Sequence, residues 1–159
     1  MNGESTTAFA PNENMSRAML ATVLYRMSGE TAEADSSFRD VSSSSYYAAA
    51  VNWASSEGIV NGTGADVFSP NASITREQLA AILYRYAQYK KYDVSVGEDT
   101  NILSYADVQS VSAYAIPAMQ WAGGAGIVNG SNGKLNPQNN ATRAEVATML
   151  MRYCEKVAK

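Results

Sequence analysis

An internal repeat dominates the sequence and limits the chain to a fold built from copies of one small unit. The segment Phe68–Leu79 aligns without a gap on Phe9–Leu20 and on Leu135–Val146. A different segment occurs twice, at Phe38–Gly62 and at Tyr105–Gly130. The chain therefore contains three copies of one half-unit and two copies of the half-unit that precedes it.

Each half-unit has the hydrophobic pattern of a helix. After Thr75, the apolar residues Leu79, Ile82, Leu83 and Tyr86 recur with helical spacing. Thr75 with Gln78, and Thr142 with Glu145, fit a capping box at the helix start. The preceding half-units predict helices over about 45–57 and 112–124, with Pro117 near the first turn and a glycine after each helix. The expected fold class is all-α, made of tandem helix-loop-helix repeats.

The repeats define the expected organisation. We expect the second half of a first unit at 1–30, a second unit at 38–90 and a third at 105–159, together forming one compact domain. Because Met1-Asn2-Gly3 matches Val60-Asn61-Gly62, the first helix of the first unit is missing from the repeat pattern. We expect the groove lined by that helix to be incomplete unless a second chain or a fragment supplies it.

Composition excludes several functions. The chain has no histidine, which removes histidine bases, triads and metal ligands. A formal net charge of -3 argues against nucleic-acid binding. No apolar run is long enough to span a bilayer, and the first residues lack the pattern of a secretory signal. The single Cys154 cannot form an internal disulfide, and its helical context predicts a small core residue.

The repeated motifs resemble those of the S-layer homology domain. They are Phe-x-Asp-Val, an alanine-rich helix with Trp-Ala, Gly-Ile-Val-Asn-Gly, Phe-x-Pro, and Thr-Arg-Glu or Thr-Arg-Ala-Glu before an amphipathic helix. The resemblance covers nearly the whole chain. It implies a pseudo-threefold, three-pronged helical spindle whose grooves bind a secondary cell-wall polysaccharide, often carrying pyruvate ketals. It further implies that the chain anchors an exported protein to the bacterial cell wall, outside the cell.

Arginines are the first candidate ligand residues. Half of the 12 basic residues are arginines at two fixed places in each copy. Arg17, Arg76 and Arg143 each follow an N-cap residue, where a cation opposes the helix dipole and favours a bound anion. A pyruvate-ketal carboxylate would suit this place. The alternative is an internal salt bridge to a carboxylate such as Asp40 or Asp107. Arg26, Arg85 and Arg152 lie near the helix C-termini, where the dipole favours a cation, and are expected to be structural. The two arginines of one copy point to opposite helical faces, so they cannot share one small site.

Further candidate ligand residues are repeated tryptophans, glycines and aspartates. Trp53 and Trp121 can serve as core anchors with one edge in a groove, or as platforms for a sugar. Gly62 and Gly130 can permit positive φ and close approach of a ligand, or simply form a turn. Asp40 and Asp107 can cap the turn that enters the first helix of the repeat, or accept hydrogen bonds from sugar hydroxyls.

Catalysis is not expected, because the repeated acids are explained by caps and no unique polar cluster breaks the repeat. We expect no cofactor, no metal site, no nucleic-acid partner and no membrane insertion. The alternative to polysaccharide binding is a protein-protein assembly module of a surface layer without glycan specificity. Arg76 and Arg143 projecting into open grooves with unpaired donors would favour the polysaccharide. Each of them bound by an internal carboxylate beneath an exposed apolar surface would favour assembly.

Overall fold

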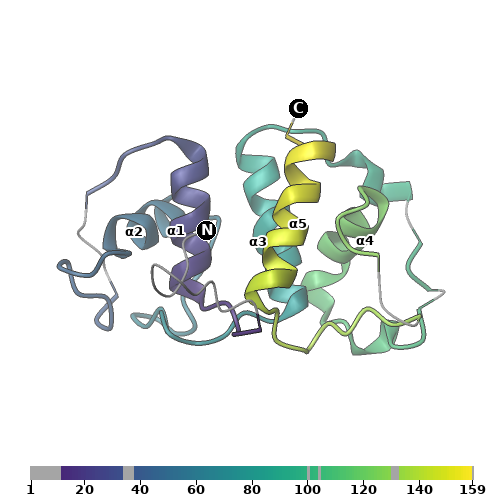
Figure 1. The fold of residues 1–159 in the computed structure, drawn as a ribbon, viewed down its shortest axis with the longest axis horizontal. Helices are drawn as coiled ribbons and strands as arrows, with labels where there is room; N and C mark the ends of the chain where they lie inside the picture. Colours follow the sequence, from purple (N-terminus) through teal and green to yellow (C-terminus); the bar gives the residue numbers. More distant parts are fainter. Residues whose placement is uncertain (1–11, 34–37, 100, 104, 130–132, 159) are drawn as a thin grey trace. The chain divides into compact units, whose positions relative to one another are not determined.

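A computed structural model describes residues 12–33, 38–99, 101–103, 105–129 and 133–158 (Figure 1). The helices in these residues are α1 (Arg17–Ser28), α2 (Ala48–Ser56), α3 (Arg76–Tyr89), α4 (Ile116–Gly124) and α5 (Arg143–Lys156), with short 3₁₀ helices η1 (Ser95–Asp99), η2 (Val108–Ser110) and η3 (Ala113–Ala115). The described ranges contain isolated β-bridges but no β-strand. The predicted all-α class is confirmed, and the threefold spindle stays a prediction.

The described chain forms two compact units. One comprises residues 15–73 and contains α1 packed on α2; the other comprises residues 12–14 and 74–158 and contains α3 packed on α4. Each unit thus joins the second helix of one sequence repeat to the first helix of the next. The repeat expected at 38–90 is divided between the units, so the packed helix pair and the sequence repeat are offset by half a repeat.

The helix starts follow the capping chemistry of the sequence. Ser16 Oγ accepts a hydrogen bond from the Met19 amide at 3.1 Å. Thr75 and Gln78 form the complete predicted capping box. Thr142 Oγ1 accepts from the Glu145 amide at 3.1 Å, but the Glu145 side chain turns toward Arg76. The capping box predicted for α5 is therefore only half formed.

Helices α2 and α4 begin later than predicted, because turns and the 3₁₀ helix η3 occupy the residues before them. Pro117 lies in the first turn of α4, as expected. Gly58 and Gly126 follow the two helices in left-handed conformations, with φ of 73° and 79°. These glycines confirm the predicted helix ends, because a side chain would strain the backbone there.

A tryptophan fills the core of each helix pair. The ring of Trp53 packs on Tyr25 with centroids 5.6 Å apart, and that of Trp121 packs on Tyr84 at 5.5 Å. Both indoles are almost fully buried. Trp53 Nε1 donates to Glu30 Oε2 at 2.6 Å. The indoles of both tryptophans therefore lie in the core, as the first of the two interpretations expects, and their ligand role stays a prediction.

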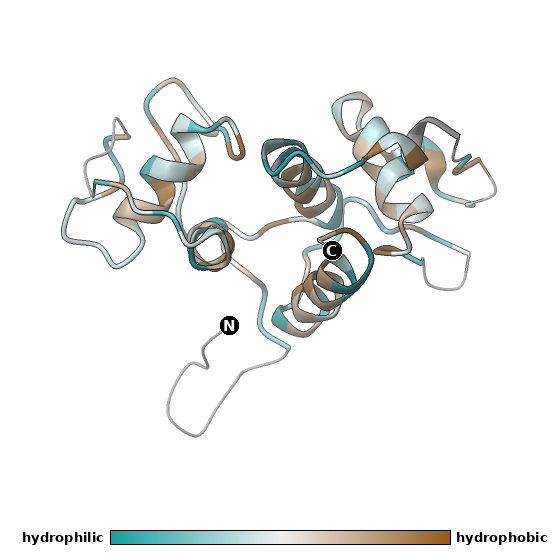
Figure 2. Ribbon diagram, turned by 90° about the horizontal axis from the view of Figure 1, so that it is seen from above, coloured by the Kyte–Doolittle hydropathy of each residue, from teal (hydrophilic) through white to brown (hydrophobic). Residues whose placement is uncertain are grey.

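Helix α5 contacts the rest of its unit through one face. Tyr153 is buried against Tyr86, Tyr92 and Trp121. Burial raises the pKa of the Tyr153 phenol, so this hydroxyl stays neutral. Cys154 is exposed, so its prediction as a core residue was wrong. Figure 2 shows hydrophilic and hydrophobic residues interspersed along the helix that lies near the C-terminus.

In each of the two full repeats, an aspartate accepts hydrogen bonds from the turn before the second helix. Asp40 accepts from the amides of Phe68 and Ser69 at 2.9 and 2.8 Å. Asp107 accepts from the amides of Leu135 and Asn136, both at 2.8 Å. Ser69 and Asn136 have positive φ, which non-glycine residues adopt only at a cost. Asp40 and Asp107 thus hold a turn as expected, but it is the turn before the second helix and not the predicted turn into the first helix.

Gly62 has no positive φ, so that part of its prediction was wrong. A Cβ at this position would lie 2.6 Å from both Phe38 Cε1 and the Val67 carbonyl oxygen. Packing within the turn, rather than conformational freedom, requires glycine here. Gly130 lies outside the described residues.

The hydrogen bonds from backbone amides to Asp40 and Asp107 make the folding stability of the chain depend on pH. Desolvation acts to raise the pKa of Asp107, but the amides of Leu135 and Asn136 outweigh it and lower the pKa below 3.8. A lowered folded-state pKa contributes stability above pH 3.8 that is lost as the pH falls through the folded pKa.

We expect Asp107→Ala to lose about 1–2 kcal/mol of folding free energy at pH 7, because two backbone amides lose their acceptor. Urea unfolding should show this loss shrinking below about pH 4. Asp66→Ala, a change at an exposed ion pair with Arg39, should have little effect at either pH. A pH-independent loss for Asp107→Ala would contradict this account.

A pair of glycine variants tests the packing of the turn. Gly62→Ala should destabilise the fold by roughly 1–3 kcal/mol, because the new methyl group overlaps Phe38 and the backbone. Gly64→Ala is the control, since its Cβ would meet only Val67 Cβ at an ordinary 3.7 Å. Thermal unfolding of both variants measures the difference. Equal melting temperatures for the two variants would show that packing does not select glycine at position 62.

Candidate binding pocket

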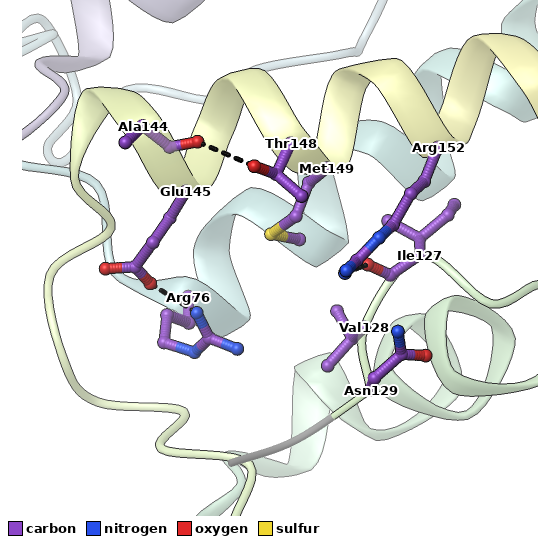
Figure 3. Close-up of a pocket in the computed structure, with 9 residues that line it drawn as sticks. All are labelled: Arg76, Ile127, Val128, Asn129, Ala144, Glu145, Thr148, Met149 and Arg152. Carbon is purple, nitrogen blue, oxygen red and sulfur yellow. Dashed lines mark hydrogen bonds and ion pairs between the residues drawn. The ribbon is translucent and has the colours of Figure 1, made fainter. Parts of the chain in front are cut away.

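The second unit contains a pocket of about 270 Å³ between the start of α3, the loop after α4 and one side of α5 (Figure 3). The lining residues are Arg76, Ile127, Val128, Asn129, Ala144, Glu145, Thr148, Met149 and Arg152. Three sequence motifs therefore meet here: the arginine after an N-cap, the Gly-Ile-Val-Asn-Gly loop and the last repeated helix. The repeat brings together residues that are far apart in the sequence.

The guanidinium group of Arg76 is bound through two of its nitrogen atoms. Its Nε donates to the Leu135 carbonyl at 3.0 Å, and its Nη1 forms an ion pair with Glu145 Oε2. The Arg76 side chain is 16% exposed. The sequence alternative of an internal salt bridge is thus correct in kind, but the partner is Glu145 and not Asp107, which is occupied by backbone amides.

The other two arginines of this set are buried. Arg17 Nε donates to the Phe68 carbonyl at 2.9 Å, and its Nη2 donates to the Asn61 carbonyl. Its guanidinium carbon lies 4.8 Å above the centre of the Phe68 ring. Arg143 is only 2% exposed. Among the three arginines that the sequence treats alike, Arg76 is the one that lines this pocket.

Arg152 is a pocket residue that the sequence reasoning missed. Its Nη1 donates to the Ile127 carbonyl at 3.2 Å, and its side chain lies along the pocket wall (Figure 3). The prediction compared the two arginines within one copy, which lie on opposite helical faces. In the structure, the first arginine of one copy and the second arginine of the next line the same pocket. The signal was present in the sequence, since the second arginine also recurs in every copy.

The pocket combines positive charge with an apolar wall. Two guanidinium groups and the Glu145 carboxylate leave one net positive charge, although the whole chain carries -3. Ile127, Val128 and Met149 supply apolar surface. Thr148 Oγ1 donates to the Ala144 carbonyl at 3.0 Å and can still accept a hydrogen bond. This arrangement suits a small anion attached to an apolar group.

The remaining predicted ligand residues lie outside this pocket. The tryptophans at 53 and 121 are in helix cores, the aspartates at 40 and 107 hold turns, and the glycine at 62 is packed in a turn. Their ligand roles remain predictions that the pocket does not support. The buried Glu77 also lies outside this pocket and accepts from Gln138 Nε2 at 2.6 Å and from the Ser112 amide at 3.2 Å.

The described part of the chain holds neither a metal-binding cluster nor a membrane-spanning helix. No group of three or more aspartate, glutamate or cysteine side chains is arranged there to hold a metal ion. No helix there is long and apolar enough to cross a membrane.

Comparison with known proteins gives matches along almost the whole chain. The amylopullulanase of Thermoanaerobacterium thermosulfurigenes is 35% identical over 97% of this chain, and the endoglucanase of a Bacillus species is 33% identical over 98%. The surface-layer 125 kDa protein of Lysinibacillus sphaericus is 31% identical over 98%. The chain spans only 8%, 16% and 13% of these relatives, respectively.

A family match completes the comparison. The S-layer homology domain matches residues 37–80 and 104–147, the two full repeats of the sequence analysis. Domains of this family are non-catalytic modules that hold surface-layer and other cell-surface proteins at the cell wall, outside the cell. The two matches, the repeated helix pairs and the shared loop motifs together show that this chain belongs to the S-layer homology domain family.

Proposed function

We propose that the chain anchors an exported protein by binding a pyruvylated secondary cell-wall polysaccharide in the pocket between α3 and α5. The observation that carries the proposal is the meeting of Arg76 and Arg152, from neighbouring repeats, in one pocket with an apolar wall. Arginine binds carboxylates through charge-assisted hydrogen bonds. A pyruvate ketal presents a carboxylate beside a methyl group, which matches the guanidinium groups and the surface of Ile127, Val128 and Met149.

The pocket size favours a single sugar residue. Its volume of about 270 Å³ lies below the roughly 300 Å³ at which pockets for larger organic ligands begin. One ketal-bearing sugar fills it, and the rest of the polymer extends into solvent. Tight attachment to the wall then comes from several weak contacts along one polymer, or from several domains. The larger protein supplies the activity or forms a surface lattice.

Sedimentation with cell-wall sacculi tests this function. We expect the chain to sediment with sacculi and to lose this property when the secondary polymer is stripped. Arg152→Ala should weaken binding at least tenfold, because a charge-assisted hydrogen bond to the ligand is lost. Arg26→Ala is the control, since Arg26 holds the same place in α1 and is exposed. Sedimentation that is indifferent to both the polymer and Arg152 would refute binding of the polysaccharide in this pocket.

A second candidate function rests on an uncovered face of α5. Helices α1 and α3 are covered by α2 and α4, and their residues Tyr25 and Tyr84 contact the tryptophans. Met151 holds the corresponding place in α5 and is 53% exposed. The neighbouring Ala147 is half-buried, whereas its counterparts Ala21 and Ala80 are fully buried. Among the residues that the structure describes, no helix therefore covers the face of α5 that corresponds to the helix-binding faces of α1 and α3.

We propose that this face binds an alanine-rich, tryptophan-bearing helix like α2 and α4, contributed by a second polypeptide. The corresponding faces of α1 and α3 already bind a helix of this type, namely α2 and α4, and this is the reason to expect it on α5. Its indole would cover Met151 as Trp53 covers Tyr25 and Trp121 covers Tyr84. Such a contact would join chains in a surface layer while leaving the polysaccharide pocket to perform the anchoring.

Methyl NMR tests this docking face. A synthetic peptide with the sequence of residues 112–129 should shift the Met151 methyl signal upfield, because an indole ring would lie above it. The same peptide with alanine in place of its tryptophan should lose most of the effect, and Met151→Glu should abolish binding by placing a charge in the apolar face. No shift of the Met151 signal, or equal shifts with both peptides, would contradict the proposed occupant.

A further inference from the structure

Glu145 places a carboxylate where the carboxylate of the proposed ligand would bind. Its Oε2 is paired with Arg76 Nη1, and both residues line the pocket (Figure 3). The side chain of Glu145 is 38% exposed, against 16% for that of Arg76. The glutamate is therefore the partner that solvent and an incoming anion reach more easily.

The side chain of Glu145 has an alternative position in the capping box of α5, as Gln78 in α3 shows. Gln78, at the same position of α3, accepts from the Thr75 backbone amide at 3.0 Å and completes the capping box. Glu145 instead pairs with Arg76 through Oε2, and its Oε1 accepts a hydrogen bond from the Thr142 hydroxyl at 3.2 Å. A carboxylate in the first turn of a helix is favoured by the helix dipole and by the N-cap amide. Rotation of one side chain would give α5 the cap that α3 already has.

Arg76 would stay in place if Glu145 left. Its Nε is tied to the Leu135 carbonyl, as Arg17 Nε is tied to the Phe68 carbonyl at the corresponding turn. The first arginine continues to a second backbone carbonyl, that of Asn61, whereas Arg76 ends on a movable side chain. The guanidinium of Arg76 is therefore positioned by the backbone and occupied by a displaceable partner.

We propose that Glu145 is an internal competitor of the acidic ligand: it holds Arg76 in the free domain and swings to the N-cap of α5 when a ligand carboxylate replaces it. This inference rests on the proposed function. The exchange replaces one ion pair of Arg76 by another and adds one cap hydrogen bond. A neutral sugar cannot take the place of Glu145 at Arg76, so Glu145 competes with acidic saccharides alone.

Calorimetric titration of wild type and Glu145→Gln tests this role. The probes are a methyl glycoside with a 4,6-pyruvate ketal and its isopropylidene analogue, in which a methyl group replaces the carboxylate. Glutamine removes the competing charge and can complete the capping box, as Gln78 does in α3. We expect Glu145→Gln to bind the acidic glycoside about tenfold more tightly and to bind the neutral analogue no better. Glu155→Gln makes the same charge change at an exposed site on α5 and should leave the affinity unchanged.

Hydrogen exchange supplies a second readout. In wild type, exchange of the Thr142 amide should slow on addition of the acidic glycoside, because Glu145 then accepts from that amide; in Glu145→Gln it should be slow from the start. Equal or weaker binding of the acidic glycoside by Glu145→Gln would overturn the proposal, and so would a Thr142 exchange rate that the ligand does not change. If neither protein binds the acidic glycoside, the proposed function at this pocket fails and the competitor role fails with it.

Discussion

The tie between the arginine after an N-cap and a backbone carbonyl of the adjacent turn fixes the geometry on which the pocket depends. Arg17 makes it to Phe68 and Arg76 makes it to Leu135, at 2.9 and 3.0 Å. The same turns are stapled from the other side by Asp40 and Asp107. A cation at a helix N-terminus is unfavourable by up to about 1 kcal/mol, so these bonds must offset the dipole before the arginine can serve a ligand.

Much of the fold follows from the sequence because it is encoded locally. The helix starts at Ser16, Thr75 and Thr142 were predictable from capping chemistry, and the glycine ends at Gly58 and Gly126 from backbone sterics. The choice of core for the tryptophans was also within reach, since small neighbours on a short helix favour close packing. The late start of α4 was missed because a 3₁₀ turn, which is common at the start of an α-helix, occupies the residues before it, and that of α2 because other turns do so.

The pocket could be predicted only in part because it is made between repeats. Helical periodicity correctly separates the two arginines of one copy, but it cannot show that Arg76 of one copy meets Arg152 of the next. The same limit applies to Glu145, whose spacing from Thr142 predicts a capping box. The carboxylate of Glu145 pairs with the nearby guanidinium of Arg76 instead, because a hydrogen bond to a charged group is stronger than one to a neutral amide. Cys154 was misplaced because its helix has an open face that only the packed structure reveals.

The central claim is that an acidic saccharide enters the pocket between α3 and α5. The most direct measurement is an amide NMR titration of the chain with a pyruvylated glycoside. The account predicts that shift changes gather at Arg76, at residues 127–129 and along 144–152, where the pocket is lined. Changes gathered instead around the Asp40 turn, or no saturable changes at all, would contradict it.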